Sequence, residues 1–473
     1  MRRILCGIAA ILCCVTLLTP ALAEVAFLPV IAEWELDSIP VELTLSADVT
    51  AHAPFDEDRL PQLTGLMKHL SLRVTRQPLL DEIQSTVDVL VDGEEALGIG
   101  LQQSGQSTMA QFSVLPTVTY AGADPLATLL GASSEPFTLL GLDGSEAAWL
   151  NEGYELLNAL EAGFAPYLTS ESKVKTEIQD MGTARLKQDY TVSKDNAPGL
   201  TAMLTGLCPE GRLRELIARL VFSGKQTLRV YRDADGLPLR VEWNGSCGLD
   251  EDHLRNAKLT WRMRRDDVAY RDNLSLSSPA LKGTDRNTLN WVFDITPNKA
   301  GQPVLKCELS YTRSADKQKS TWTGSCKLTA EEVDEGTRVT GEATVSRQLP
   351  EDSRATTYAF TPDLVFSSDV NTPAIDGTLT VASMNGKKVL SQAALSVSLR
   401  RAEYTAWQMR ENTVDLSVLD ALTLDILRQQ VRGAVADACL RRLLLLPRED
   451  LDYLFKDLPE ESVQAILNAA QSH

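Results

Sequence analysis

The sequence predicts a β-rich α+β fold: a large, bent antiparallel sheet with a few packed helices, followed by a C-terminal helical tail. From residue 225 to about residue 400, apolar and polar side chains alternate almost without interruption, which is the period of half-buried strands. Before this region, strand patterns are mixed with helical stripes, and beyond residue 402 the apolar period is helical. These changes of period set the fold class.

A hairpin predicted at residues 305–328 is the centre of this interpretation. Folded about its polar middle at residues 315–318, it places Cys307 opposite Cys326 and Tyr311 opposite Trp322 on one face. The sequence motif Trp-x-Gly-Ser-Cys occurs twice, at 243–247 and at 322–326. The repeat indicates an internal duplication of a strand-turn-strand unit.

The first half of the chain mixes strands and helices. Strict alternation begins at Val41 and predicts a strand, and the apolar stripe at 59–70 predicts a helix. Asp92-Gly93 has the chemistry of a hairpin turn. Further strands are predicted at 72–75, 83–91, 96–102, 108–114, 117–120, 173–179 and 184–192, and further helices at 124–131, 146–168 and 210–222.

The tail is predicted to be helical. Its apolar stripe runs from Leu416 to Leu443, with a break expected near Gly433, and two short helices follow at 448–456 and 460–470. One face of this tail is too apolar to stand in water, so it either covers the sheet or meets a partner.

The N-terminus indicates export. Arg2-Arg3 precedes an apolar run at 4–18 and a small-x-small site ending at Ala23, which predicts a signal peptide over 1–23. We expect a secreted protein of the extracellular space or the cell envelope, without a transmembrane segment after cleavage. The expected domains are 24–280, a helix-plus-sheet unit; 281–401, a β extension or second β domain; and 402–473, the tail.

Composition restricts the partners. The chain has 473 residues, 44% hydrophobic and 23% charged, as in an ordinary globular protein. A formal net charge of -18 repels phosphate, so we expect no nucleic-acid partner.

Cysteines outside the signal peptide suggest disulfides in an oxidising compartment. The predicted hairpin favours a bond between Cys307 and Cys326, and a bond between Cys208 and Cys247 is a weaker possibility. Cys439 is expected to be a small apolar residue on a helix. Neither the cysteines nor the histidines have metal-ligand spacing, so no metal site is predicted.

No catalytic motif is found. A Gly-x-Ser-x-Gly nucleophile turn, a Walker sequence and a dinucleotide fingerprint are all absent from the sequence, so we expect no cofactor and no catalytic residue. The tryptophans of the β region are candidates for lining an apolar site, but the pattern favours core-facing anchors beneath the helices. They are Trp243, Trp261, Trp291 and Trp322.

The order of elements over residues 34–279 resembles the LolA-like and LppX-like half-barrel family of bacterial lipoprotein carriers. This resemblance implies a bent sheet that shelters lipid beneath helices, and it transfers no functional residue. We therefore expect a non-catalytic exported bacterial protein that binds an apolar ligand, such as an acyl chain or lipid. The alternative is a cell-surface structural or interaction module that docks a protein through residues 412–470. An enzyme with a carboxylate pair is a third reading.

Overall fold

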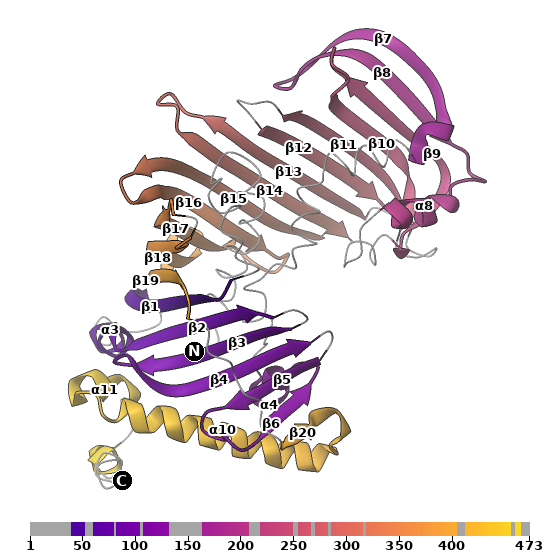
Figure 1. The fold of residues 1–473 in the computed structure, drawn as a ribbon. Coiled ribbons are helices and arrows are strands. Elements are labelled where there is room, and N and C mark those ends of the chain that lie inside the picture. Colours follow the sequence, from indigo (N-terminus) through magenta and orange to yellow (C-terminus); the bar gives the residue numbers. More distant parts are fainter. Residues whose placement is uncertain are drawn as a thin grey trace.

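A single antiparallel sheet organises the molecule (Figure 1). The computed structural model describes residues 39–52, 60–79, 82–104, 107–131, 163–207, 218–248, 254–265, 270–281, 285–315, 318–369, 371–403, 412–455 and 459–464. Within these residues the sheet has 20 strands, which confirms the predicted fold class. The predicted signal peptide lies outside the described residues.

The strands fall into two groups along the chain. The first group is β1 (Val41–His52), β2 (Leu70–Pro78), β3 (Ile83–Val91), β4 (Glu94–Ser104), β5 (Ser107–Phe112) and β6 (Thr119–Gly122). The second is β7 (Leu168–Ile178), β8 (Gly182–Val192), β9 (Val221–Arg232), β10 (Pro238–Gly248), β11 (Arg255–Arg265), β12 (Tyr270–Pro279), β13 (Arg286–Pro297), β14 (Pro303–Ala315), β15 (Gln318–Val333), β16 (Gly336–Gln348), β17 (Thr356–Ser367), β18 (Ala374–Asn385), β19 (Lys388–Arg401) and β20 (Thr413–Asp415).

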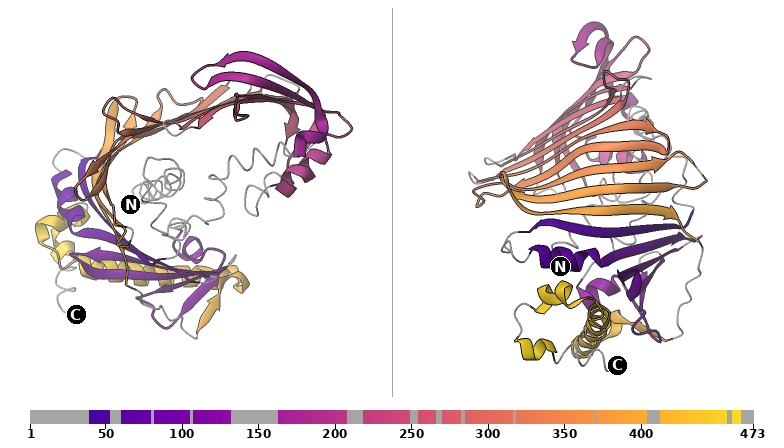
Figure 2. Two further views of the ribbon diagram at one scale, coloured as in Figure 1. Left: turned by 45° about the horizontal axis from the view of Figure 1, so that its top comes forward. Right: turned by 90° about the vertical axis from the view of Figure 1, so that its left-hand side faces the viewer.

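Hydrogen bonding joins the two groups through β1. The strands β7 to β19 pair in chain order, β19 then pairs with β1, and β1 to β6 continue the same sheet. The short β20 adds to β6 in parallel. The sheet curves into an open arc (Figure 2). β12 pairs with β13 along its whole length. The sheet therefore continues without interruption across residue 280.

Register divides the side chains between two faces of the sheet. Directly opposite residues share a face, so the pairings can be followed from strand to strand. One face, called here the apolar face, carries the buried residues Leu43, Val74, Val87, Ile99, Val230, Val241, Phe293, Leu305, Leu328, Leu364 and Ile375. The other, the outer face, carries mostly hydroxyl and charged side chains, such as Glu308, Ser325, Thr344 and Asp363.

Helices cover the apolar face over β1 to β6. α4 (Pro125–Leu130) and α10 (Ala421–Leu443) pack against a cluster that includes Phe112, Leu129 and Val431. α4 lies on the inner side of the arc (Figure 2). Two arginines of α10 fasten the helices together, because Arg428 and Arg432 donate hydrogen bonds to carbonyl oxygens at the C-terminal end of α4. This end of the sheet is a closed core.

A second helical cover lies over β8 to β11. α8 (Gly199–Leu207) and the 3-10 turn η1 (Ala165–Tyr167) pack against Tyr190, Val230 and Met263 on the same apolar face. α8 also lies inside the arc (Figure 2). The inner side of the arc is therefore the apolar side.

In the tail, helix α11 (Arg448–Phe455) packs on α3 (Leu60–Lys68), and residues 460–464 are again helical. At this contact His69 bridges two carboxylates: Nδ1 lies 2.5 Å from Asp92 Oδ1 and Nε2 lies 3.0 Å from Asp450 Oδ2. Gly65 permits the close approach, because a side chain there would overlap the Asp450 carboxylate. The tail is thus held by packing and by an ionic bridge.

Most predicted elements are confirmed where they can be compared. Asp92 and Gly93 both have positive φ, 52° and 80°, as a two-residue hairpin turn requires. The break expected near Gly433 is wrong, since α10 continues through it; its packing on β4 and α4 outweighs one helical glycine.

Two further helix predictions need correction. The helix predicted at 210–222 extends too far, because β9 starts at Val221 and Phe222 packs in the sheet core. The helix predicted at 146–168 also extends too far, since Leu168 begins β7; most of that range lies outside the described residues. α8 was not predicted, since its short apolar sequence has no distinct helical stripe.

Candidate functional site

A row of apolar side chains crosses five neighbouring strands at one end of the apolar face. Register places its members directly opposite one another, from β13 to β17. In order they are Trp291, Leu309, Gly324, Val345 and Tyr358. This row is the candidate site.

The row is unusual because three of its four side chains are exposed, while the fourth, Trp291, is half-buried and packs against the neighbouring core. Leu309 is 43% exposed, Val345 46% and Tyr358 47%, although they lie on the same face as fully buried leucines elsewhere in the sheet. Adjacent exposed apolar residues mark binding surfaces more often than isolated ones do.

A second row next to the first adds aromatic surface. Tyr311 lies opposite Trp322, and their ring centroids are 5.4 Å apart with planes inclined by 37°. The sequence predicted this pair from the hairpin. Within the first row, Gly324 carries no side chain and leaves a notch between Leu309 and Val345.

The tryptophan candidates separate into two groups. All lie on the apolar face. Trp243 packs on Phe222 beneath α8, and Trp261 belongs to the same cluster and donates a hydrogen bond to the buried Asp272. Trp291 and Trp322 lie in the two rows described above. Trp243 and Trp261 therefore anchor a core, and only Trp291 and Trp322 adjoin the exposed row.

The cysteine pair lies beside the site. Cys307 is directly opposite Cys326, as predicted, and both residues are thiols in the structure. Directly opposite Cα atoms lie about 4.5–5.5 Å apart, which suits a disulfide, so the bond remains a prediction. Burial raises the pKa of the Cys307 thiol, and a hydrogen bond with Trp291 opposes this. A raised pKa makes a thiol less reactive.

The other described cysteines are Cys247 and Cys439. Cys247 is a thiol whose pKa is raised by burial, and Cys208 lies outside the described residues, so their bond stays untested. Cys439 belongs to α10 and packs against the core that this helix covers. Burial raises the pKa of its thiol too.

Sequence reasoning missed three members of the exposed row. Leu309 was placed in the hairpin but not recognised as exposed, and Val345 and Tyr358 were placed on strands without register. The signal that could have found them is the continuation of the hairpin register onto the next two strands. Their exposure could not be read from a pattern, because it depends on what covers the face.

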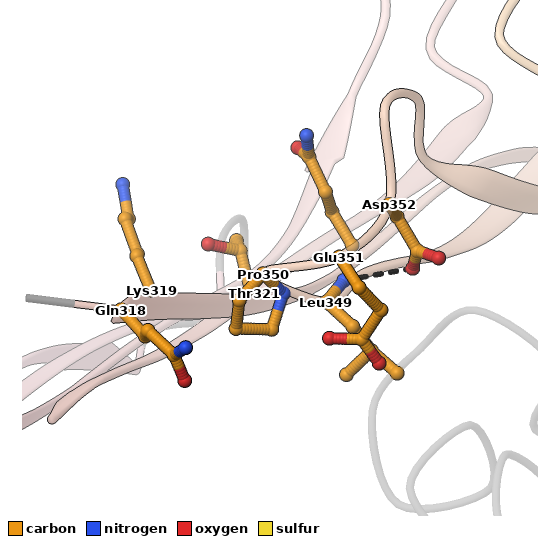
Figure 3. Close-up of a pocket in the computed structure, with 8 residues that line it drawn as sticks. Gln318, Lys319, Thr321, Leu349, Pro350, Glu351 and Asp352 are labelled. Carbon is orange, nitrogen blue, oxygen red and sulfur yellow. Dashed lines mark hydrogen bonds between the residues drawn. The ribbon is translucent and has the colours of Figure 1, made fainter.

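A polar depression of about 480 Å³ opens at the same end of the sheet (Figure 3). It is lined by the start of β15 and the turn after β16, where the backbone N–H of Leu349 donates to the Asp352 carboxylate. Lys319 and Glu351 give it a mixed charge. Its lining holds no catalytic constellation.

Two features are absent from the described part of the chain. No helix there is both long and apolar enough to cross a bilayer. No group of three or more potential metal ligands occurs among the same residues.

Comparisons with known proteins give no family. No family model matches the chain, and no curated protein matches its sequence. Among solved structures, it is similar to the outer-membrane expressed OmpT of Vibrio cholerae, with a TM-score of 0.26 and 7% identity over 77% of this chain and 96% of that one. A loop L8 deletion mutant of the same protein gives a TM-score of 0.22 and 5% identity over 76% and 96%. Similarity this low carries no argument about fold, location or function.

Proposed function

We propose that this protein is a non-catalytic, exported bacterial binding protein that holds an apolar ligand, such as an acyl chain or lipid, against the apolar face of its sheet. The observation that carries the proposal is the exposure of Leu309, Val345 and Tyr358 in one row. Apolar area left in water costs about 25 cal/mol per Å², so a ligand that covers the row gains that free energy.

The arrangement suits a long apolar molecule better than a compact one. The row crosses strands that lie about 4.8 Å apart, and Trp291 and Trp322 supply flat surface along it. The resemblance of residues 34–279 to the lipoprotein-carrier half-barrels points the same way, as does the signal peptide predicted from the sequence.

The test is native mass spectrometry of protein purified from its own host. We expect stoichiometric lipid that is lost on delipidation and regained on addition of a fatty acid. Val345→Asp should abolish rebinding, because it places a charge in the exposed row. Thr344→Asp is the matched control, since it adds the same charge on the outer face of the same strand. Protein that carries no lipid and takes none up would refute the proposal.

The alternative, docking of a protein partner through residues 412–470, has one specific observation in its favour. Leu422 is 72% exposed and Ile426 49%, one turn apart on α10, and Val418 of the preceding η2 (Leu416–Val418) is 75% exposed. Truncating the tail would also expose the core around Val431. Leu422→Glu with Ile426→Glu is the cleaner test: loss of a co-purifying partner with unchanged stability would favour this function.

A further inference from the structure

Basic side chains lie beside the exposed row, on the same face. Arg347 is directly opposite Trp322, and Arg313 lies on β14 two residues beyond Tyr311, so it shares the face of Tyr311. Both arginines are exposed. Since β14 and β16 flank β15, a group placed over the start of β15 has an arginine on each side.

On the apolar face, positive charge near these arginines is not balanced by negative charge. The neighbouring positions of the apolar face carry no acidic residue; they are Asn287, Leu289, Trp291, Leu309, Tyr311, Ser320, Trp322, Gly324 and Val345. No ion pair joins Arg313 or Arg347 to another residue of the described ranges. On the outer face, by contrast, arginines are paired, as Arg338 is with Asp363 through two bonds of 2.7 Å.

This contrast matters because the protein as a whole is acidic, with a net charge of -18. In such a protein, two arginines on either side of one strand that have no ion pair within the described residues are most easily explained by an anion that they meet on binding. Guanidinium groups bind carboxylate and phosphate in a bidentate geometry, with hydrogen bonds about twice as strong as neutral ones.

We infer that the site takes a single-chain amphiphile whose acyl chain lies along the exposed row and whose anionic head group lies between Arg313 and Arg347. The inference rests on the proposed function and adds the ligand class. The apolar row and the two arginines are contiguous through Tyr311 and Trp322, so one molecule can contact both. A neutral lipid would leave the arginines without a counter-charge.

Gly324 sets the depth of the site at the junction. A Cβ at this position would lie 3.7 Å from both Leu309 Cβ and Thr344 O, which is ordinary contact, so the backbone does not require glycine here. The absence of a side chain leaves a shallow notch between Leu309 and Val345. Gly324→Leu should therefore fill the notch, and Gly324→Ala should leave the sheet intact.

The experiment compares oleate with oleyl alcohol, which has the same chain and no charge. Binding to delipidated full-length protein is followed by displacement of a fluorescent fatty acid at low ionic strength. We expect oleate to bind at least about tenfold more tightly than the alcohol, because charge-assisted bonds form only with the acid. Arg313→Gln with Arg347→Gln should remove this preference and leave alcohol binding unchanged.

The controls separate the possible failures. Lys319→Gln with Lys327→Gln removes the same charge from the outer face of β15 and should preserve the preference. If the unmodified protein binds acid and alcohol equally, the inference is wrong and the proposed function stands. If it binds neither, both fail. Gly324→Leu should weaken both ligands while Gly324→Ala does not; equal binding by all three would place the ligand elsewhere and overturn the inference.

Discussion

The apolar face of the sheet is covered by helices in one region and open in another. Over β1 to β6 it is covered by α4 and α10, and Leu101 there is 0% exposed. Over β13 to β17 one end of it is open, and Leu309 is 43% exposed. The two leucines occupy equivalent places in an alternating strand. Coverage by another element therefore decides whether the same pattern becomes core or binding surface.

The largest expected difference comes from the same substitution at both places. Leu101→Ala should lower the free energy of unfolding by about 2–5 kcal/mol, because it leaves a cavity in a closed core. Leu309→Ala should change it by no more than about 0.5–1 kcal/mol, because the side chain already meets solvent. Urea denaturation measures both. Equal losses would contradict the division into closed and open regions.

A second pair of substitutions tests whether the open region is still a well-defined sheet. Gly341 has a φ of 149°, and a side chain there would overlap the Lys327 carbonyl oxygen on the neighbouring strand. Gly341→Ala should destabilise the protein by about 1–3 kcal/mol. Gly324→Ala on the adjacent strand is the control and should be neutral or slightly stabilising. Comparable effects of the two changes would argue against a rigid open region.

The pH dependence of the tail tests how the closed region is held. The hydrogen bond to Asp92 raises the pKa of His69, burial opposes this, and the bond to Asp450 raises the pKa further. Neutral imidazole has one N–H and cannot donate to both carboxylates, so the bridge is complete only when His69 is protonated. Its stabilisation is fully present below about pH 6.5 and is lost as pH rises through the raised pKa.

Hydrogen exchange of α11 measures this effect. After correction for the intrinsic rate, protection of residues 448–455 should fall as pH rises, while protection in β15 stays constant. His69→Gln is the control and should make the protection of α11 independent of pH. Unchanged protection in the unmodified protein would show that apolar packing alone holds the tail.

The smallest effect is expected on the outer face, where charges are paired in solvent. Burial by itself would raise the pKa of Asp189, but hydrogen bonds from Arg229, Lys187 and Ser170 lower it to about 2. Its stabilisation is present above the ordinary value and is lost as pH falls through about 2. Arg229→Gln should cost about 1 kcal/mol or less at neutral pH and move acid unfolding to higher pH. Lys327→Gln should do neither.

Much of the fold could be read from the sequence because each strand has one apolar side. The predicted strand at 83–91 has the bounds of β3, and the hairpin at 305–328 has the register of β14 and β15. Errors arose where tertiary packing outweighed local pattern: β9 takes Phe222 from the predicted helix, and α10 continues through Gly433. The joining of β19 to β1 was not foreseen, since no local signal pairs strands so far apart.

Only part of the candidate site could be predicted from the sequence. Trp291 and Trp322 were named with Trp243 and Trp261, and nothing in their spacing separated the two that adjoin the exposed row from the two beneath α8. Arg313 and Arg347 drew no attention, because a lone arginine on a strand is ordinary. Their relation to Trp322 emerges only when the register of three strands is known.

The sequence by itself determined that this chain forms a long antiparallel sheet with one apolar face, because alternation with a period of two leaves a strand no other way to hide its apolar side chains. Only the tertiary structure decided which part of that face is closed and which is open. That outcome depends on where α4, α8 and α10 come to rest, and such long-range packing has no counterpart in local periodicity.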